Sequence, residues 1–186
     1  MGTLSYVATV SLDGAIADPD GDFGWFAPDA DVFAAHLERM RSVSTEILGR
    51  RTYDLMRYWT DLPADEGGGP EQEFARLWRN LDIVAASSTM TEQDLADPRH
   101  RLTPRLGLDD IARIVDDASG IVEIFGPTVA TAAMRAGLVD QYRLFVVPTM
   151  IGGGLRALPD GIHAELDLVD RRMFSGGVLY LQYERR

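Results

Sequence analysis

Short apolar runs recur along the chain and predict strands. Residues 4–10, rich in β-branched and small apolar side chains, indicate a strand that is buried on both faces of a sheet. Comparable runs lie at residues 46–49, 82–86, 121–125 and 142–147, with a weaker one near Leu102. Together these runs predict a sheet with a largely buried centre.

Between the runs, apolar positions recur at helical spacing and predict helices. One stripe runs from Val32 to Met40, and it begins after acidic residues that suit the positive end of a helix dipole. Further helices are predicted at residues 52–57, 71–79, 108–118 and 127–134. Pro127 at a first helical position and Gly137 just past the helix end follow the usual capping preference.

The last third of the chain changes pattern. Residues 166–172 and 178–183 flank Ser175-Gly176-Gly177 with no helix between them, which predicts an antiparallel hairpin at a sheet edge. Strands that alternate with helices before this hairpin predict an α/β fold, with a mixed, mainly parallel sheet and helices on both faces. We expect residues 1–186 to form a single domain, with residues 60–70 as a polar loop.

The net charge of the chain limits the kinds of partner that it can bind. The formal net charge is −11 and the pI is near 4.6, so the surface repels nucleic acid and acidic membranes. A small anionic ligand would need a local basic pocket. The first residues contain no basic region and no long apolar run, which favours a cytoplasmic protein without a signal peptide.

Several kinds of chemistry are excluded by residue type. The chain has no cysteine and no lysine, so thiolate metal sites, cysteine nucleophiles and Schiff-base lysines are ruled out. All 18 cationic side chains are arginine, which favours planar, bidentate phosphate contacts. His36, His100 and His163 lack the short spacing of zinc ligands, and we expect them at the surface.

Three strand ends carry polar side chains that remain candidates for a site. Gly49-Arg50-Arg51-Thr52 places two arginines at a helix start, where an anionic ligand would offset the unfavourable dipole interaction; surface ion pairs are the alternative. Ser87-Ser88 and Gly126-Pro127-Thr128 follow two other strands, although either could be plain turn chemistry. If the three ends meet at one sheet edge, they could bind a phosphorylated dinucleotide.

Two large aromatic residues, Trp25 and Phe26, end a loop that is dense in turn residues. They either close the edge of the core or form a ligand wall, because loops on a rigid scaffold often carry function.

Motifs in a fixed order point to a known family. The sequence contains, in chain order, Ser11-Leu12-Asp13-Gly14-Ala15-Ile16-Ala17, Ile47-Leu48-Gly49-Arg50-Arg51-Thr52-Tyr53, Gly126-Pro127, Gly137-Leu138-Val139-Asp140, and Pro148 with Ile151-Gly152-Gly153-Gly154. This order resembles the dihydrofolate reductase-like superfamily, whose fold has three layers. It looks closest to the branch related to the C-terminal reductase domain of the bifunctional riboflavin-biosynthesis deaminase-reductase.

The resemblance implies NADPH as the cofactor. Its adenosine phosphate region would contact Gly49, Arg50, Arg51 and Thr52, with Ser87 and Ser88 near the 2′-phosphate. The implied pyrophosphate turn consists of Gly126, Pro127, Thr128 and Val129, and Thr9 and Ile16 would border the nicotinamide. The resemblance also implies a homodimer.

The resemblance implies fewer residues for the substrate site than for the cofactor site. Residues 13–26 correspond to the mobile active-site loop, so Asp13 and Trp25 are candidate substrate residues. The acidic catalytic residue of dihydrofolate reductases corresponds to Asp31, with Asp29 as a rival; either could instead be an exposed helix-start carboxylate. Ala15 replaces a lysine that is common in the riboflavin branch, and Phe125 replaces a glycine.

We therefore expect an NADPH-dependent reductase of a small heterocyclic substrate, resembling either dihydrofolate or a riboflavin-pathway pyrimidine. The alternative is a nucleotide-binding module of the same fold without turnover.

Overall fold

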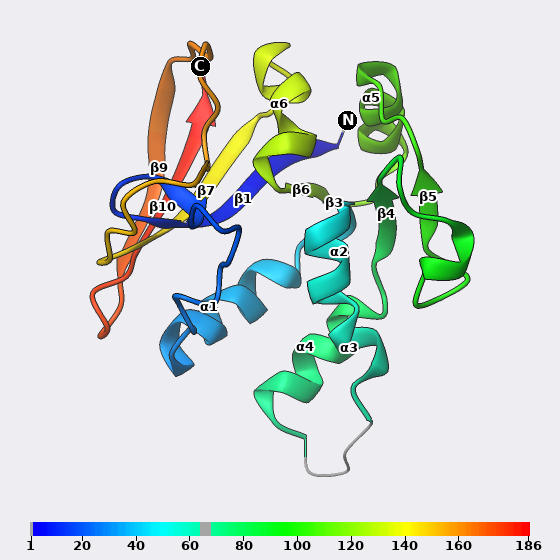
Figure 1. The fold of residues 1–186 in the computed structure, drawn as a ribbon, viewed down its shortest axis with the longest axis horizontal. Coiled ribbons are helices and arrows are strands. Elements are labelled where there is room, and N and C mark those ends of the chain that lie inside the picture. Colours follow the sequence, from blue (N-terminus) through cyan, green and yellow to red (C-terminus); the bar gives the residue numbers. More distant parts are fainter. Residues whose placement is uncertain (1, 64–67) are drawn as a thin grey trace.

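A computed structural model of the protein describes residues 2–63 and 68–186 and shows an eight-stranded sheet (Figure 1). The order of the strands is β5-β4-β3-β6-β1-β7-β10-β9. Their bounds are β1 Thr3–Ser11, β3 Val43–Gly49, β4 Asp82–Ala86, β5 Arg101–Thr103, β6 Ile121–Phe125, β7 Gln141–Val147, β9 Leu166–Met173 and β10 Leu179–Arg185. In the order of the sheet, all strands from β5 through β4, β3, β6 and β1 to β7 run parallel. β10 pairs antiparallel with β7, and β9 pairs antiparallel with β10. The predicted mixed sheet and terminal hairpin are confirmed.

Helices cover both faces of the sheet, as predicted (Figure 1). Their bounds are α1 Ala30–Met40, α2 Arg50–Met56, α3 Tyr58–Asp61, α4 Pro70–Trp78, α5 Leu108–Asp117 and α6 Pro127–Arg135, with a 3-10 turn at Glu92–Asp94. Ile111 of α5 and Ala130 of α6 pack on one face, while Met40 of α1 and Trp78 of α4 pack with the apolar cluster of the other face. No helix in these described ranges is both long enough and apolar enough to cross a bilayer.

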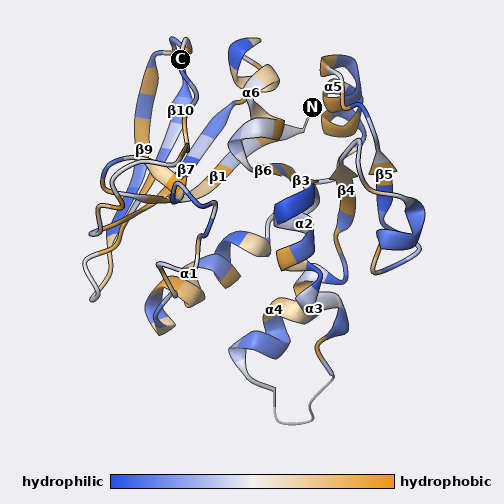
Figure 2. Ribbon diagram, in the orientation of Figure 1, coloured by the Kyte–Doolittle hydropathy of each residue, from blue (hydrophilic) through white to orange (hydrophobic). Residues whose placement is uncertain are grey.

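The pattern of hydropathy explains why the central strands are buried. Apolar residues dominate β1, β3 and β6, whereas polar residues alternate along β9 at the sheet edge (Figure 2). Tyr6, Ile47 and Ile124 on the three central strands have no exposed surface. Burial on both faces follows from the two helical layers.

Two short strands and one short helix were not predicted from the sequence. β2 (Ala15–Ala17) pairs antiparallel with β8 (Leu155–Arg156), about 140 positions away along the chain. Gly154 makes this approach possible, since its φ is +99° and a Cβ there would come within 2.0 Å of the Ala17 carbonyl oxygen. α3 shortens the loop expected at residues 60–70, of which residues 64–67 lie outside the described part of the chain.

Four charged side chains are buried between the sheet and α1. Arg39 of α1 forms an ion pair with Glu123 of β6, and Arg143 of β7 lies 3.5 Å from the same carboxylate. Glu46, which neighbours Glu123 across the β3–β6 pair, accepts no hydrogen bond from any described residue. Burial raises the pKa of Glu46 to about 7, although Arg39 acts in the opposite direction.

The raised pKa predicts that Glu46 makes stability depend on pH. The folded protein retains the Glu46 proton at pH values where the unfolded chain, with a pKa near 4.5, has released it. The contribution of Glu46 to the free energy of unfolding is therefore present at low pH and is lost as the pH rises through about 7. We expect Glu46→Gln to increase the free energy of unfolding at pH 8 by about 1–3 kcal/mol, with a smaller gain at pH 5.

Urea denaturation of both proteins at the two pH values measures this effect. Glu71→Gln, at an exposed position on α4, is the matched control and should change neither value. A larger gain at pH 5 than at pH 8 would contradict the prediction.

Candidate functional site

A cavity of about 600 Å³ opens at the carboxyl ends of the central parallel strands. Its walls come from β1, from the ends of β3, β4 and β6, and from the first residues of α2 and α6. The loop between β2 and α1, one residue of α1, the end of α2 and residues of β2 and β8 complete the lining. Ligands of open α/β sheets bind in this crevice, so the cavity is the candidate site.

The three polar strand ends predicted from the sequence lie next to one another. β3 lies between β4 and β6, with Gly49 opposite Ala86 and Leu48 opposite Phe125. All the residues expected to bind the cofactor line this one cavity: Thr9, Ile16, Gly49, Arg50, Arg51, Thr52, Ser87, Ser88, Gly126, Pro127, Thr128 and Val129. Their shared location agrees with the expected site, while their individual roles stay predictions.

The two arginines differ in their contacts. Arg50 donates hydrogen bonds to the carbonyl and hydroxyl oxygens of Thr89, at 2.8 and 2.9 Å, and its Nε lies 3.7 Å from the Asp54 carboxylate. Arg51 forms no ion pair with a described carboxylate, and Gly21 lies so close that a Cβ there would be 2.8 Å from its Nη1. The surface ion pair considered above therefore exists for Arg50, whereas the Arg51 charge is free of such a partner among the described residues.

The β6–α6 connection brings the backbone close to the cavity. Gly126 has a φ of +91°, which favours glycine, and a Cβ on it would lie 3.6 Å from Thr52 Oγ1. α6 starts at the next residue with no side-chain cap on its first turn. Its first amide groups and the positive end of its dipole suit a phosphate group, which fits the pyrophosphate of a dinucleotide.

Neither candidate catalytic carboxylate lines the cavity. Asp31 is exposed and accepts a hydrogen bond from Ser175 Oγ at 3.0 Å, while Asp29 caps α1 by accepting the Val32 N–H at 2.9 Å. Both positions match the helix-start alternative rather than the catalytic one. No described residue of the cavity lining carries a carboxylate.

Asp13, expected to contact substrate, lies outside the lining and joins two loops instead. Its carboxylate accepts hydrogen bonds from Ser11 Oγ at 2.6 Å, from Gly152 N at 2.8 Å and from Ile151 N at 3.2 Å. These bonds lower the pKa of Asp13 to about 2, and the bond from Ser11 contributes most to that shift. Asp13 therefore fastens the start of the β2 segment to the glycine-rich turn before β8.

Trp25 combines both roles considered for the loop aromatics. Trp25 and Phe26 line the cavity and also pack against the apolar cluster that contains Val32 and Phe145. The buried indole N–H of Trp25 has no acceptor among the described residues. The aromatic pair thus closes the core edge and forms part of the cavity wall.

The expectation that the histidines lie at the surface is wrong for His100, and His36 is half-buried rather than exposed. His100 is buried and shares a 2.8 Å hydrogen bond with the Tyr53 hydroxyl. His36 lines the cavity, with its ring centroid 4.2 Å from that of Phe145. Position 36 follows Val32 by four residues and precedes Met40 by four, so the helical spacing itself could have placed His36 on the inner side of α1.

Burial lowers the pKa of His36 to about 3, and the nearby Arg39 acts in the same direction. The imidazole is therefore neutral at physiological pH. His36 makes no hydrogen bond to any described residue, which leaves its ring nitrogens available to a ligand.

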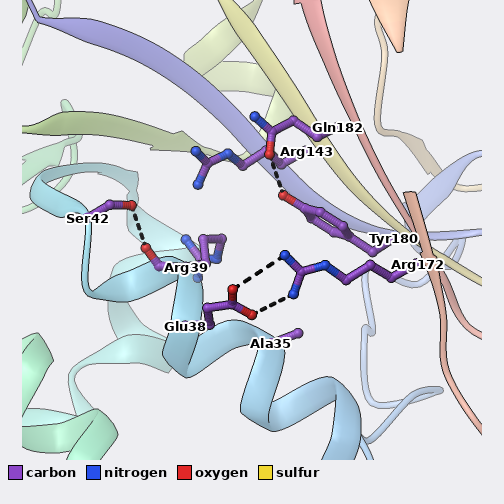
Figure 3. A pocket seen from close by; sticks show the side chains of 8 residues that line it. All are labelled: Ala35, Glu38, Arg39, Ser42, Arg143, Arg172, Tyr180 and Gln182. Atoms are coloured by element: carbon purple, nitrogen blue, oxygen red, sulfur yellow. Dashed lines mark hydrogen bonds and ion pairs between the residues drawn. The ribbon is translucent and has the colours of Figure 1, made fainter. Parts of the chain in front are cut away.

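A second, smaller cavity of about 170 Å³ lies between α1 and the strands β7, β9 and β10 (Figure 3). Arg39, Arg143 and Arg172 line it, and each lies beside a carboxylate: Glu123 for the first two and Glu38 for the third. Because these arginines already have acidic partners, this cavity is a poor candidate for binding an anion.

The sheet order, the two helical layers and the cavity define a dihydrofolate reductase-like fold. Dihydrofolate reductase from Enterococcus faecalis, in a complex with NADP(H), superposes with a TM-score of 0.65 at 16% identity, covering 100% of this chain and 97% of that one. A pyrimidine reductase-like protein from Corynebacterium diphtheriae gives a TM-score of 0.70 at 16% identity, covering 100% and 92%. The predicted fold is confirmed.

Sequence comparison supports the narrower resemblance. Residues 118–180 match the family model of the RibD C-terminal domain. The riboflavin biosynthesis protein RibD of Mycobacterium tuberculosis is 26% identical over 160 residues, which is 84% of this chain but only 45% of RibD. The uncharacterized protein YyaP of Bacillus subtilis is 25% identical over 176 residues, covering 94% of this chain and 90% of YyaP. The predicted resemblance to this branch is confirmed.

The geometry around Asp13 predicts a pH-dependent structural role. Its pKa is about 2 in the folded protein and 3.8 ordinarily, so its contribution to stability is present above pH 3.8 and is lost as the pH falls through 2. We expect Asp13→Asn to lower the melting temperature at pH 7, since the amide cannot accept all three hydrogen bonds as a carboxylate does. The difference in melting temperature between Asp13→Asn and the parent protein should narrow as the pH falls from 5 toward 2.

Thermal unfolding followed by circular dichroism across this pH range measures the difference. Asp116→Asn, on α5 and outside these loops, is the matched control. A deficit for Asp13→Asn that stays constant down to pH 2 would contradict the role of its charge.

Proposed function

We propose that the protein is an NADPH-dependent reductase of a small heterocyclic substrate. The observation that supports this proposal most directly is the meeting of three strand ends in one cavity, where they offer arginines, hydroxyl groups and the N-terminus of α6. The fold is shared with a dihydrofolate reductase that holds NADP(H), and RibD of M. tuberculosis is a relative in sequence.

The proposed cofactor site runs across the sheet. Arg50, Arg51 and the hydroxyls of Ser87 and Ser88 would hold the 2′-phosphate at the ends of β3 and β4. The first turn of α6 would hold the pyrophosphate. Thr9 on β1 lies three strands away from β4, about 14 Å at the usual strand spacing, and would border the nicotinamide.

Bound NADPH would supply a hydride to an unsaturated carbon of the substrate. The neighbouring heteroatom would then take up a proton. Because no described carboxylate lines the cavity, this chain would leave that proton to solvent rather than to Asp31. The walls formed by Trp25 and Phe26 would orient the substrate ring and limit its hydration.

One observation favours a second candidate, a nucleotide-binding module without turnover. A reductase of the dihydrofolate type uses a pocket carboxylate, whereas Asp31 and Asp29 here point to Ser175 and to the start of α1. NADPH that binds but is not oxidised with dihydrofolate, the riboflavin-pathway pyrimidinone or simple carbonyl compounds would favour this candidate.

One further proposal rests on the resemblance alone. A homodimer is expected, and light scattering coupled to size-exclusion chromatography measures it.

Replacing Arg50 and Arg51 with alanine should weaken NADPH binding far more than NADH binding. Only NADPH carries the 2′-phosphate, and each lost charged hydrogen bond costs about 1.5–3 kcal/mol. Arg51→Ala alone should weaken NADPH binding more than Arg50→Ala alone, because the Arg50 side chain already bonds to Thr89. Isothermal titration with both cofactors measures the difference.

Arg76→Ala is the matched control, since Arg76 is exposed on α4 and does not line the cavity. It should leave both affinities unchanged. Equal losses for NADPH and NADH in the double variant would refute the 2′-phosphate assignment, and no binding of either cofactor to the parent protein would refute the cofactor itself.

A further inference from the structure

Arg50 and Thr89 connect α2 to the segment that follows β4. Arg50 is the first residue of α2 and lines the large cavity, whereas Thr89 lies outside the lining. Both hydrogen bonds from the Arg50 side chain to Thr89 come from Nη1, one to the carbonyl oxygen and one to the hydroxyl. The two hydrogens of Nη1 are therefore engaged, and no described residue accepts a hydrogen bond from Nη2. Thr89 thus fixes the guanidinium group while leaving one of its nitrogens to a ligand.

The Thr89 hydroxyl also contacts a serine of the cavity lining. Thr89 Oγ1 lies 3.2 Å from Ser87 Oγ, and the Thr89 N–H donates a hydrogen bond to the same serine oxygen at 3.2 Å. Because Thr89 Oγ1 accepts a hydrogen from Arg50, it can donate its own hydrogen to Ser87 Oγ. Ser87 Oγ then accepts two hydrogen bonds, which leaves the Ser87 O–H to point elsewhere as a donor.

A buried anchor holds the segment of Thr89 against α2. The Tyr53 hydroxyl of α2 accepts the Ala96 N–H at 2.8 Å and shares a 2.8 Å hydrogen bond with His100 Nδ1. Tyr53 has no exposed surface, and Met90 is buried in the same apolar cluster. Thr89 is itself exposed, but these contacts fix the backbone on which it lies.

Fixing a side chain before a ligand arrives lowers the cost of binding. A free arginine loses conformational entropy when a ligand immobilises it, whereas Arg50 has already lost part of that freedom to Thr89. A phosphate group offers only acceptor oxygens in its ionised form, so it gains from donors that are already oriented. Through Thr89, the ends of β3 and β4 each present one such donor, Arg50 Nη2 and the Ser87 hydroxyl.

We propose that Thr89 is a positioning residue that sets the preference for NADPH over NADH. Its hydroxyl orients Arg50 and Ser87 toward the 2′-phosphate without contacting the phosphate itself. The preference therefore depends on a residue outside the cavity lining. This inference rests on the proposed function, because it requires the adenosine end of NADPH to bind at the ends of β3 and β4.

Two fragments of the cofactor test the role of Thr89 apart from turnover. Adenosine 2′,5′-bisphosphate carries the 2′-phosphate, and adenosine 5′-monophosphate lacks it. Thr89→Val removes the hydroxyl but keeps the branched shape and the carbonyl group that Arg50 also contacts. We expect it to raise the Kd of the bisphosphate about fivefold and to leave that of the monophosphate unchanged, as measured by isothermal titration. The same difference should appear between NADPH and NADH.

A conservative variant and a neighbouring threonine provide the controls. Thr89→Ser retains the hydroxyl and should restore most of the affinity for the bisphosphate. Thr91→Val removes a hydroxyl of the same segment that bonds to Asp94 instead of Arg50, and should leave the Kd values of both fragments unchanged.

A double-mutant cycle separates positioning from a general loosening of the segment. Thr89 acts mainly through Arg50, so Thr89→Val should raise the Kd of the bisphosphate by less than about twofold when Arg50 is already alanine. A loosened segment would instead weaken binding to the same extent with either residue at position 50.

The outcomes separate this inference from the function on which it rests. If neither the bisphosphate nor NADPH binds to the parent protein, the cofactor site fails, and the role of Thr89 fails with it. If both bind but Thr89→Val weakens neither, weakens the monophosphate equally, or acts fully in the Arg50→Ala protein, the role of Thr89 is overturned while the cofactor site stands. A loss that is confined to the ligands with a 2′-phosphate and restored by Thr89→Ser supports the inference.

Discussion

The parallel pairing of β3 with β4 and β6 is the constraint on which the candidate site depends. Parallel strands end at the same edge, so this pairing brings together three polar segments that are separated by about 35 to 40 positions along the chain. Each segment alone resembles an ordinary turn. Side by side they place arginines, hydroxyl groups and the N-terminus of α6 on one cavity.

The buried charged residues between α1 and the sheet contact a residue that lines the cavity. Arg39 pairs with Glu123 and also lies 5.3 Å from the centre of the Phe125 ring, which lines the cavity. The same arginine helps to keep His36 neutral. A pair buried in this way contributes little net stability, but removing one partner leaves an uncompensated charge. The arrangement thus holds α1 against β6.

The acidic residues near the cavity differ in their contacts from what the motifs alone imply. The resemblance suggests a pocket carboxylate, but helix capping engages Asp29, and Asp31 bonds to Ser175. Asp13 is likewise engaged by backbone amides near β8. Three acidic residues in or near the β2–α1 loop therefore serve local structure, and His36 is a polar residue of the cavity lining.

The sequence by itself determined the elements whose signals are local. Apolar runs located the main strands, Pro127 and Gly137 marked the ends of α6, and Ser175-Gly176-Gly177 marked the hairpin. The motif order was also sufficient to identify the fold and the residues that line its cavity at three strand ends. These features depend on backbone conformation and hydrophobic period, which neighbouring residues set.

Only the tertiary structure decided the features that depend on distant partners. The β2–β8 pair needs Gly154 beside Ala17, and no local pattern of three residues predicts such a contact. The partial burial of His36 depends on Phe145 and Arg39 around it, and the position of Asp31 depends on a serine 144 residues away. Which acidic or basic group reaches the cavity is a matter of three-dimensional packing, because a side chain's direction and protonation depend on everything that surrounds it.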